Sequence, residues 1–321
     1  MTTRHLVDKE LLAALDALPV AEINGETLPA FRAGILQMVE SVLPIEGDGI
    51  RVSEISVPGP ANGPDVRVLF YQPEKRGGPL PAFLHMHGGG YLVGIPERDD
   101  ARNRMLVREC GCAVVSVDYR LAPEAPFPGG VEDCYAVLQW LYRNAEALGV
   151  DEKRIAIGGE SAGGGMAAAL ALLARDRREV PLAFQLLIYP MIDNLTGANG
   201  HDVTLAGEFI WTKASNDYAW RALLGDAHKG RDASPYAAAA RAQDLSGLPP
   251  AYIAVGTLDL FVDENIEYAR RSISAGVPTE LKVYPGAYHG FEDLAPDAAI
   301  SRAFVRDYVS ALQRALNPLT L

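Results

Sequence analysis

The stretch RIAIGGESAGGGMAAALALLAR, residues 154–175, decides the fold of this chain of 321 residues. Residues 154–157 have the character of a short buried strand, and residues 162–175 that of a helix rich in alanine and leucine. Between them stands G-E-S-A-G at 159–163, which fits the G-x-S-x-G pattern of a serine on a sharp strand-to-helix turn. The small residues Gly159 and Gly163 let strand and helix approach closely. The stretch therefore predicts Ser161 as a nucleophile; the alternative is a glycine-rich helix start with a capping serine.

Short apolar runs alternate with helical patterns on both sides of this stretch. The strand-like runs are 82–86, 113–117, 155–157, 184–189, 252–255 and 281–284. The helical patterns span about 99–110, 131–147, 162–176, 264–275 and 297–316. This alternation predicts an α/β fold with a mostly parallel central sheet flanked by helices. Two earlier runs, 51–57 and 65–71, are separated by a turn rich in proline and glycine, and they predict an antiparallel hairpin at one edge of the sheet.

Two other regions show no strand pattern. Residues 1–45 have apolar positions at roughly helical spacing, such as Leu11, Leu15 and Leu18. Residues 192–230 are rich in aromatic side chains and follow the carboxyl end of a predicted strand, where ligands bind in open α/β sheets. We therefore expect residues 192–230 to form a helical cap over a site; the alternative is a surface helix pair packed on the core.

The composition excludes several classes of partner. A formal net charge of -12 repels phosphate backbones and anionic headgroups, so we expect no nucleic-acid partner. The sequence has no apolar run of 18 or more residues and no apolar segment typical of a signal peptide near its start, which predicts no membrane insertion and a cytoplasmic protein. Cys110, Cys112 and Cys134 form neither a disulfide framework nor the paired C-x-x-C of a zinc site, so we expect free thiols and no bound metal.

The sequence H-G-G-G-Y at 87–91 directly follows the predicted strand 82–86. Consecutive glycines let the backbone turn its N–H groups toward one point, which predicts an oxyanion hole shared with the N–H of Ala162. The alternative is a flexible glycine loop. We expect His87 to brace this loop, and we assign His85 no role beyond packing.

His289 follows the last strand-like run and is the predicted general base. It is the histidine that follows both Ser161 and a candidate acid, as the Ser–Asp/Glu–His order of the fold requires. Asp259, in the loop after the run 252–255, is favoured as the acid over Asp263, which we expect to cap or begin the next helix. The segment 118–124 is interpreted as a rigid structural loop beside the site.

Together these motifs resemble the hormone-sensitive-lipase family of α/β-hydrolases, the bacterial family IV esterases. The resemblance covers about residues 66–296 and rests on the motifs at 87–90, 118–124, 159–163, 189–190, 259–263 and 289–291. It implies the triad Ser161, Asp259 and His289, with oxyanion donors at Gly88, Gly89 and Ala162.

The resemblance also has consequences for the domains and contains one departure. It implies a cap built from residues 1–45 and 192–230, which leaves 46–191 and 231–321 as the catalytic α/β core. Members of the family usually carry Asp or Thr before the nucleophile, whereas this chain has Glu160, whose extra methylene changes how the carboxylate packs.

The expected activity is that of a serine carboxylesterase acting on short- to medium-chain esters through an acyl-enzyme on Ser161, without a cofactor. Tyr91, Phe209 and Trp211 are the expected walls of the substrate site. Amidase, lactonase or lipase activity with the same triad is the alternative, as is a non-catalytic ligand-binding scaffold. The family's habits imply a homodimer, with an interface on helix 297–316 or strand 281–284.

Overall fold

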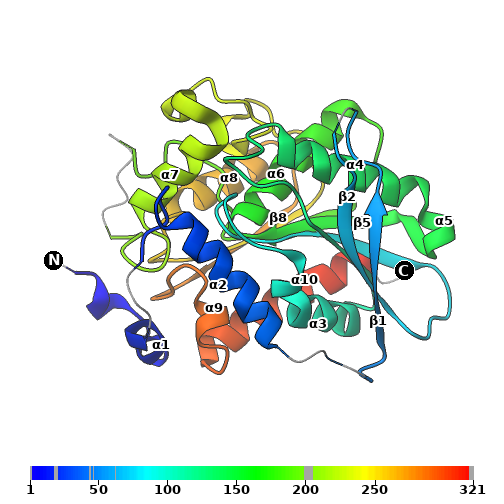
Figure 1. Ribbon diagram of the computed structural model, residues 1–321, viewed down its shortest axis with the longest axis horizontal. Helices are drawn as coiled ribbons and strands as arrows, with labels where there is room; N and C mark the ends of the chain where they lie inside the picture. The colour runs from blue at the N-terminus through cyan, green and yellow to red at the C-terminus, as the bar shows by residue number, and fades with distance from the viewer. Residues whose placement is uncertain are drawn as a thin grey trace.

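The computed structural model describes residues 2–17, 21–42, 45, 47–61, 63–198 and 205–317. Within them lies one sheet with the strand order β1-β2-β4-β3-β5-β6-β7-β8 (Figure 1). Its strands are β1 (Ile50–Val57), β2 (Val66–Pro73), β3 (Leu80–Met86), β4 (Ala113–Val117), β5 (Val150–Glu160), β6 (Phe184–Ile188), β7 (Ala251–Gly256) and β8 (Thr279–Tyr284). The pairs β1–β2 and β2–β4 are antiparallel and the other neighbours are parallel, so the predicted α/β-hydrolase fold and its edge hairpin are confirmed.

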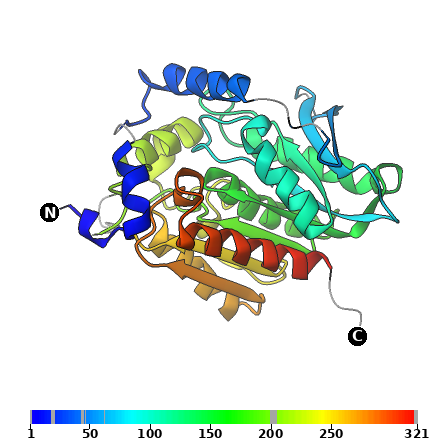
Figure 2. The ribbon, with the colours of Figure 1, turned by 90° about the horizontal axis from the view of Figure 1, so that it is seen from below.

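Helices cover both faces of the sheet (Figure 2). Helices α3 (Asp100–Cys110) and α10 (Ala299–Leu316) pack on one face and on each other. The other face carries α4 (Gly129–Arg143), α6 (Ala162–Arg177) and α8 (Val262–Ser274), with the short α5 (Ala145–Leu148) beside α4. The two layers enclose two apolar cores, one on each side of the sheet. In the described part of the chain, no helix combines the length and the apolar character needed to cross a membrane.

Strand β5 is longer than the sequence predicts. The apolar run ends at Ile157, but the strand continues through Gly158 and Gly159 to Glu160, which pairs with Ile188 of β6. Glycine and glutamate are poor strand formers, so the pattern gave no sign of this extension. The extension carries Glu160 to the carboxyl edge of the sheet, directly before Ser161.

The N-terminal region consists of short helical pieces. They are η1 (Arg4–Leu6), η2 (Lys9–Leu11), α1 (Leu12–Ala17) and α2 (Leu28–Ser41). Leu11 is fully buried as the spacing predicts, whereas Leu18 lies outside the described residues. Figure 2 shows α1 and α2 gathered at the same end of the molecule as α7 (Lys213–Leu224).

These N-terminal segments form hydrogen bonds with residues that follow the carboxyl ends of the strands. The Asp8 N–H donates to the carbonyl of Gly286 at 3.1 Å, and the Tyr288 hydroxyl donates to the carbonyl of Leu11 at 3.2 Å. Further along, the Ile23 N–H donates to the hydroxyl of Ser215 in α7 at 3.0 Å. Residues 8, 11 and 23 thus contact the segment beside His289 and α7, a helix within the stretch 192–230.

Candidate active site

Ser161 lies at the turn between β5 and α6 in a backbone conformation that side-chain-bearing residues rarely adopt, with φ of 56° and ψ of -120°. Its N–H donates to the carbonyl of Ile188 at 2.9 Å, and its carbonyl accepts from the N–H of Met191 at 3.0 Å. A Cβ atom built on Gly163 would lie 2.0 Å from the carbonyl oxygen of Met86. The close contact of the turn with β3 therefore demands glycine at this position, and the surrounding structure holds the strained serine in place.

Two hydrogen bonds connect Ser161 to a histidine and an acid. The Nε2 atom of His289 lies 2.8 Å from the Ser161 hydroxyl, and its Nδ1 atom lies 2.7 Å from Oδ2 of Asp259. Because a carboxylate can only accept a hydrogen bond, the neutral ring carries its proton on Nδ1 and donates it to Asp259. Nε2 is then free to accept a hydrogen bond from the Ser161 hydroxyl. Asp259 is 1 % exposed, and its second oxygen accepts from the N–H of Phe261 at 2.9 Å. This arrangement can draw the proton from the serine hydroxyl.

The two acid candidates lie in different surroundings. Asp259 contacts His289 directly, whereas Asp263 is an exposed residue in the first turn of α8. Asp263 thus occupies the first-turn position that its sequence context indicates.

The glycine loop after β3 lies against the serine. A Cβ atom on Gly88 would be 3.6 Å from Cβ of Ser161. Within the described residues, the N–H groups of Gly88, Gly89 and Ala162 donate to no other group. These N–H groups belong to the residues from which the sequence predicts an oxyanion hole.

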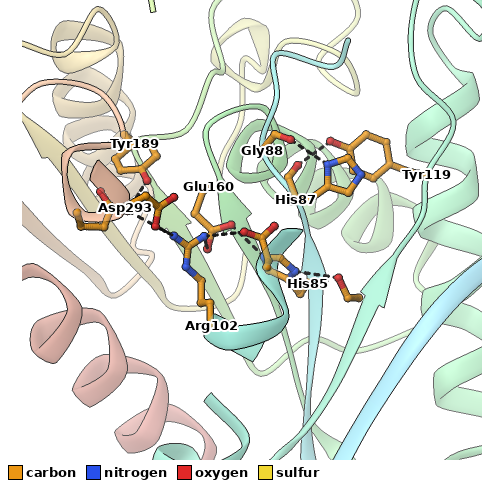
Figure 3. A network of polar contacts seen from close by, with 11 residues as sticks. His85, His87, Gly88, Arg102, Tyr119, Glu160, Tyr189 and Asp293 are labelled. Atoms are coloured by element: carbon orange, nitrogen blue, oxygen red, sulfur yellow. Dashed lines mark hydrogen bonds and ion pairs between the residues drawn. The ribbon is translucent and has the colours of Figure 1, made fainter. Parts of the chain in front are cut away.

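His87 braces this loop from behind, as expected (Figure 3). Its ring stacks on Tyr119 with centroids 4.3 Å apart, and the Tyr119 hydroxyl donates to the His87 carbonyl at 2.7 Å. Burial lowers the pKa of His87 to about 4, so the ring is neutral at physiological pH. Its Nδ1 lies 2.9 Å from the carbonyl of Gly88, which fixes the orientation of that peptide.

Trp211 lies beside His289 and the glycine loop. Its ring centroid lies 6.4 Å from that of His289, and a Cβ atom on Gly90 would lie 2.1 Å from Cη2 of the indole. The ring therefore extends from the glycine loop to the histidine. Its Nε1–H donates to Oδ1 of Asn216 at 3.2 Å, which holds the orientation of the ring.

The other two predicted wall residues lie further out or deeper. Phe209 is half-buried and packs edge-on against Tyr288, with centroids 6.2 Å apart. Tyr91 is buried, and its hydroxyl donates to the carbonyl of Met191 at 2.9 Å.

Sequence reasoning missed a group of mostly buried charged residues around Glu160, the residue before Ser161 (Figure 3). His85 does more than pack: its Nε2 lies 2.9 Å from Glu160, and its Nδ1 lies 3.1 Å from the Ser116 hydroxyl. Glu160 also contacts the guanidinium of Arg102 at 3.1 Å. Burial favours a lower pKa for His85, but the carboxylate of Glu160 outweighs it and raises that pKa. The signals available were a histidine inside an apolar strand and the glutamate that departs from the family pattern.

Comparisons with known proteins agree with this geometry. Residues 83–293 match a family described as alpha/beta hydrolase fold. Carboxylesterase NlhH of Mycobacterium tuberculosis is 34% identical over 97% of both chains, and the ethyl acetate hydrolase of Pseudomonas putida is 32% identical over 72% of both. A solved structure titled bacterial heroin esterase superposes with a TM-score of 0.92 at 40% identity, covering 98% of this chain and 100% of that one. The chain therefore belongs to the α/β-hydrolase family, in the hormone-sensitive-lipase-like branch that its motifs indicate.

Proposed function

We propose that this protein is a serine carboxylesterase that uses Ser161, His289 and Asp259 as its catalytic triad. One observation carries the proposal: a serine in a strained turn is hydrogen-bonded to a histidine and, through it, to a buried aspartate. Relatives that span nearly the whole chain are named esterases, which supports ester hydrolysis as the reaction.

The reaction proceeds in two halves. Nε2 of His289 accepts the hydroxyl proton as Oγ of Ser161 attacks the ester carbonyl, and Asp259 stabilises the imidazolium that forms. His289 then protonates the leaving alcohol, and the acyl group remains on Ser161. In the second half, His289 removes a proton from water, which attacks the acyl-enzyme; the protonated His289 then returns that proton to Oγ of Ser161 as the acid leaves. The proposed steps use side chains, backbone and water alone.

The developing negative charge is stabilised at the glycine loop. In this proposal the N–H groups of Gly88, Gly89 and Ala162 donate to the oxyanion of each tetrahedral intermediate. Two observations support these roles: Gly88 packs against Ser161 and Ala162 follows it in the chain, and none of the three N–H groups donates to another acceptor in the described structure. Each such donor contributes about 2.7–4 kcal/mol to transition-state stabilisation.

We propose esters of short- to medium-chain acids as the substrates. Trp211 forms the inner wall in this proposal, because its ring lies against both Gly90 and His289. Phe209 is assigned the outer wall and Tyr91 supports the site from below. The name of one relative, ethyl acetate hydrolase, also points to a small ester.

The test is an assay of purified protein on p-nitrophenyl esters from acetate to palmitate, beside Ser161→Ala. We expect wild type to act best on short or medium chains and the variant to lose about 10⁶-fold in kcat. A profile that peaks at palmitate would favour a lipase. Wild type that hydrolyses no ester, or a variant as active as wild type, would favour a ligand-binding protein instead.

Three broader features complete the proposal. We assign residues 1–45 and 192–230 to a cap, supported by the Ile23–Ser215 contact; residues 199–204 lie outside the described part. We propose a cytoplasmic homodimer that pairs through β8, which forms one edge of the described sheet. Light scattering on the purified protein tests the proposed dimer, because a molar mass equal to that of the monomer at micromolar concentrations would contradict it.

A further inference from the structure

Arg102 of α3 lies at the centre of the buried charged network, which we define as His85, Asp99, Arg102, Glu160, Glu292 and Asp293. Its Nη1 atom contacts Glu160 at 3.1 Å and Asp99 at 3.3 Å. Its Nη2 atom contacts Asp293 at 2.5 Å and Glu292 at 3.8 Å. The two amino groups of one guanidinium are therefore divided between two sets of carboxylates, and Figure 3 shows Arg102 between Glu160 and Asp293.

Three of these four carboxylates belong to the two segments that carry the reacting side chains. Glu160 directly precedes Ser161 in the chain. Glu292 and Asp293 lie in α9 (Phe291–Leu294), which follows His289 after a single glycine. A guanidinium that binds both sets is a bridge between the serine turn and the histidine loop.

A second path leads from the network to the histidine ring. The Tyr189 hydroxyl and the Glu292 carboxyl are hydrogen-bonded, and the Tyr189 ring lies 4.7 Å from that of His289. Tyr189 has a φ of 33°, a value that a bulky residue adopts only when its surroundings hold it there. Arg102 thus reaches His289 both through α9 and through the Glu292–Tyr189 pair.

The centre of the network is shielded from solvent, whereas the side chain of Asp293 at its edge is 43% exposed. The side chain of Arg102 is 11% exposed, as is that of Glu160. Burial favours a lower pKa for Arg102, but Asp293, Glu160 and Asp99 raise it well above the ordinary value, so the residue stays charged. Donor atoms of His85, Asp99 and Glu160 lie within 4.8 Å of one another, a spacing suited to a cation, and the guanidinium supplies that positive charge.

We propose that Arg102 is a positioning residue that keeps Ser161 and His289 at reacting distance by binding the serine turn and the histidine loop at once. The inference rests on the proposed function of the Ser161–His289 pair. A guanidinium suits the task because its fork holds two carboxylates in fixed directions, which a single ammonium cannot do. Loss of the bridge leaves both reacting groups present but poorly aligned.

The experiment compares Arg102→Met and Arg102→Lys with a matched control, Arg104→Met. Arg104 lies on the same helix, is similarly buried, and pairs with Asp48 and Asp100, away from Ser161. Two quantities are measured for each folded variant: kcat and KM on p-nitrophenyl acetate, and the rate of labelling by a fluorophosphonate, which reports the serine–histidine pair without an ester. Thermal melting shows how much each change costs in stability.

We expect Arg102→Met to lower kcat and the labelling rate about 10²-fold, while KM stays within about twofold of wild type. Arg102→Lys should remain close to Arg102→Met, and Arg104→Met should lose stability but keep its kcat. Should Arg102→Met not fold, Asp293→Asn removes one side of the bridge at a half-exposed carboxylate and should slow labelling about tenfold. Labelling of either Arg102 variant, or of Asp293→Asn, at the wild-type rate overturns the proposal.

The readouts also separate this inference from the proposed function. A wild-type protein that labels rapidly but hydrolyses no ester contradicts the carboxylesterase and still tests Arg102 through labelling. A wild-type protein that neither labels nor hydrolyses overturns both, because no reactive serine–histidine pair then exists.

Discussion

The two sides of Ser161 differ in secondary structure and in the residues that they contain. On the core side, strands and helices place charged residues such as His85, Glu160 and Arg102 in fixed, hydrogen-bonded positions. On the outer side, Trp211 follows Ile210, whose φ is 62°, in an irregular segment before α7. The Trp211 ring lies against His289 and Gly90, and its Nε1–H donates to Asn216.

This difference separates two properties of an enzyme. Side chains on the core side set the positions of the reacting atoms, so their loss should slow every substrate alike. Side chains on the outer side meet only the part of the substrate that varies, so their loss should change the ranking of substrates. Three substitutions test this division, and a fourth tests the ionisation of one carboxyl on the core side.

Asp259→Asn should have the largest effect, because the amide no longer holds the proton on Nδ1 of His289. We expect kcat to fall about 10⁴-fold on every ester, with the chain-length ranking unchanged. Asp263→Asn is the control, since that carboxylate is exposed and lies in the first turn of α8. Equal losses in the two variants would mean that the acid has been misassigned.

Trp211→Ala should remove the inner wall. We expect the ratio of kcat/KM for hexanoate to that for acetate to rise about tenfold, because the additional methylenes of the hexanoyl chain can occupy the space that the indole leaves. Phe209→Ala is the companion variant, and it should shift the ratio less because that ring packs beside Tyr288. A uniform loss on all esters after Trp211→Ala would place the tryptophan with the core side.

Glu292→Gln should change stability in a way that depends on pH. Burial, helped by Asp293, raises the pKa of Glu292 from its ordinary 4.5 to about 8. The folded protein then keeps a proton that the unfolded chain releases, so its contribution to stability is full below about pH 4.5 and is lost as the pH rises through about 8. Glutamine does not ionise, so we expect the variant to melt about 4 °C above wild type at pH 9 and equally at pH 4. Melting curves that differ by the same amount at both values contradict the raised pKa.

Tyr91→Phe should have the smallest effect. It deletes the hydrogen bond to the Met191 carbonyl and keeps the ring, which should lower the free energy of unfolding by about 1 kcal/mol. We expect kcat/KM on all esters to stay within about twofold of wild type. A large change in ester ranking would show that the hydroxyl meets the substrate.

Much of the architecture follows from the sequence, since buried strands and amphipathic helices have distinct periods. Every strand-like run from 51–57 to 281–284 became a strand, and the motifs at Ser161, Asp259 and His289 meet in space. Each of these side chains sits at the carboxyl end of a strand, where the fold concentrates functional groups.

The buried charged network could not be predicted in the same way. Arg102 has no sequence pattern that sets it apart from Arg104 or Arg108 on the same helix. Its partners come from positions 99, 160, 292 and 293, and only the tertiary structure brings them to the Arg102 side chain. Ion pairs between residues far apart in the sequence depend on the tertiary structure. No spacing of residues in a single sequence indicates which of them will pair.

The contacts of residues 8 and 11 with the segment 286–288 affect the order in which the protein folds during synthesis. A ribosome releases the early residues long before it synthesises the loop that carries His289. Residues 8 and 11 therefore cannot form these hydrogen bonds until residues 286–288 have been synthesised. Contacts between residues so far apart in the sequence form late in folding. Enzyme activity should thus appear only after the histidine loop has docked on residues that left the ribosome before it.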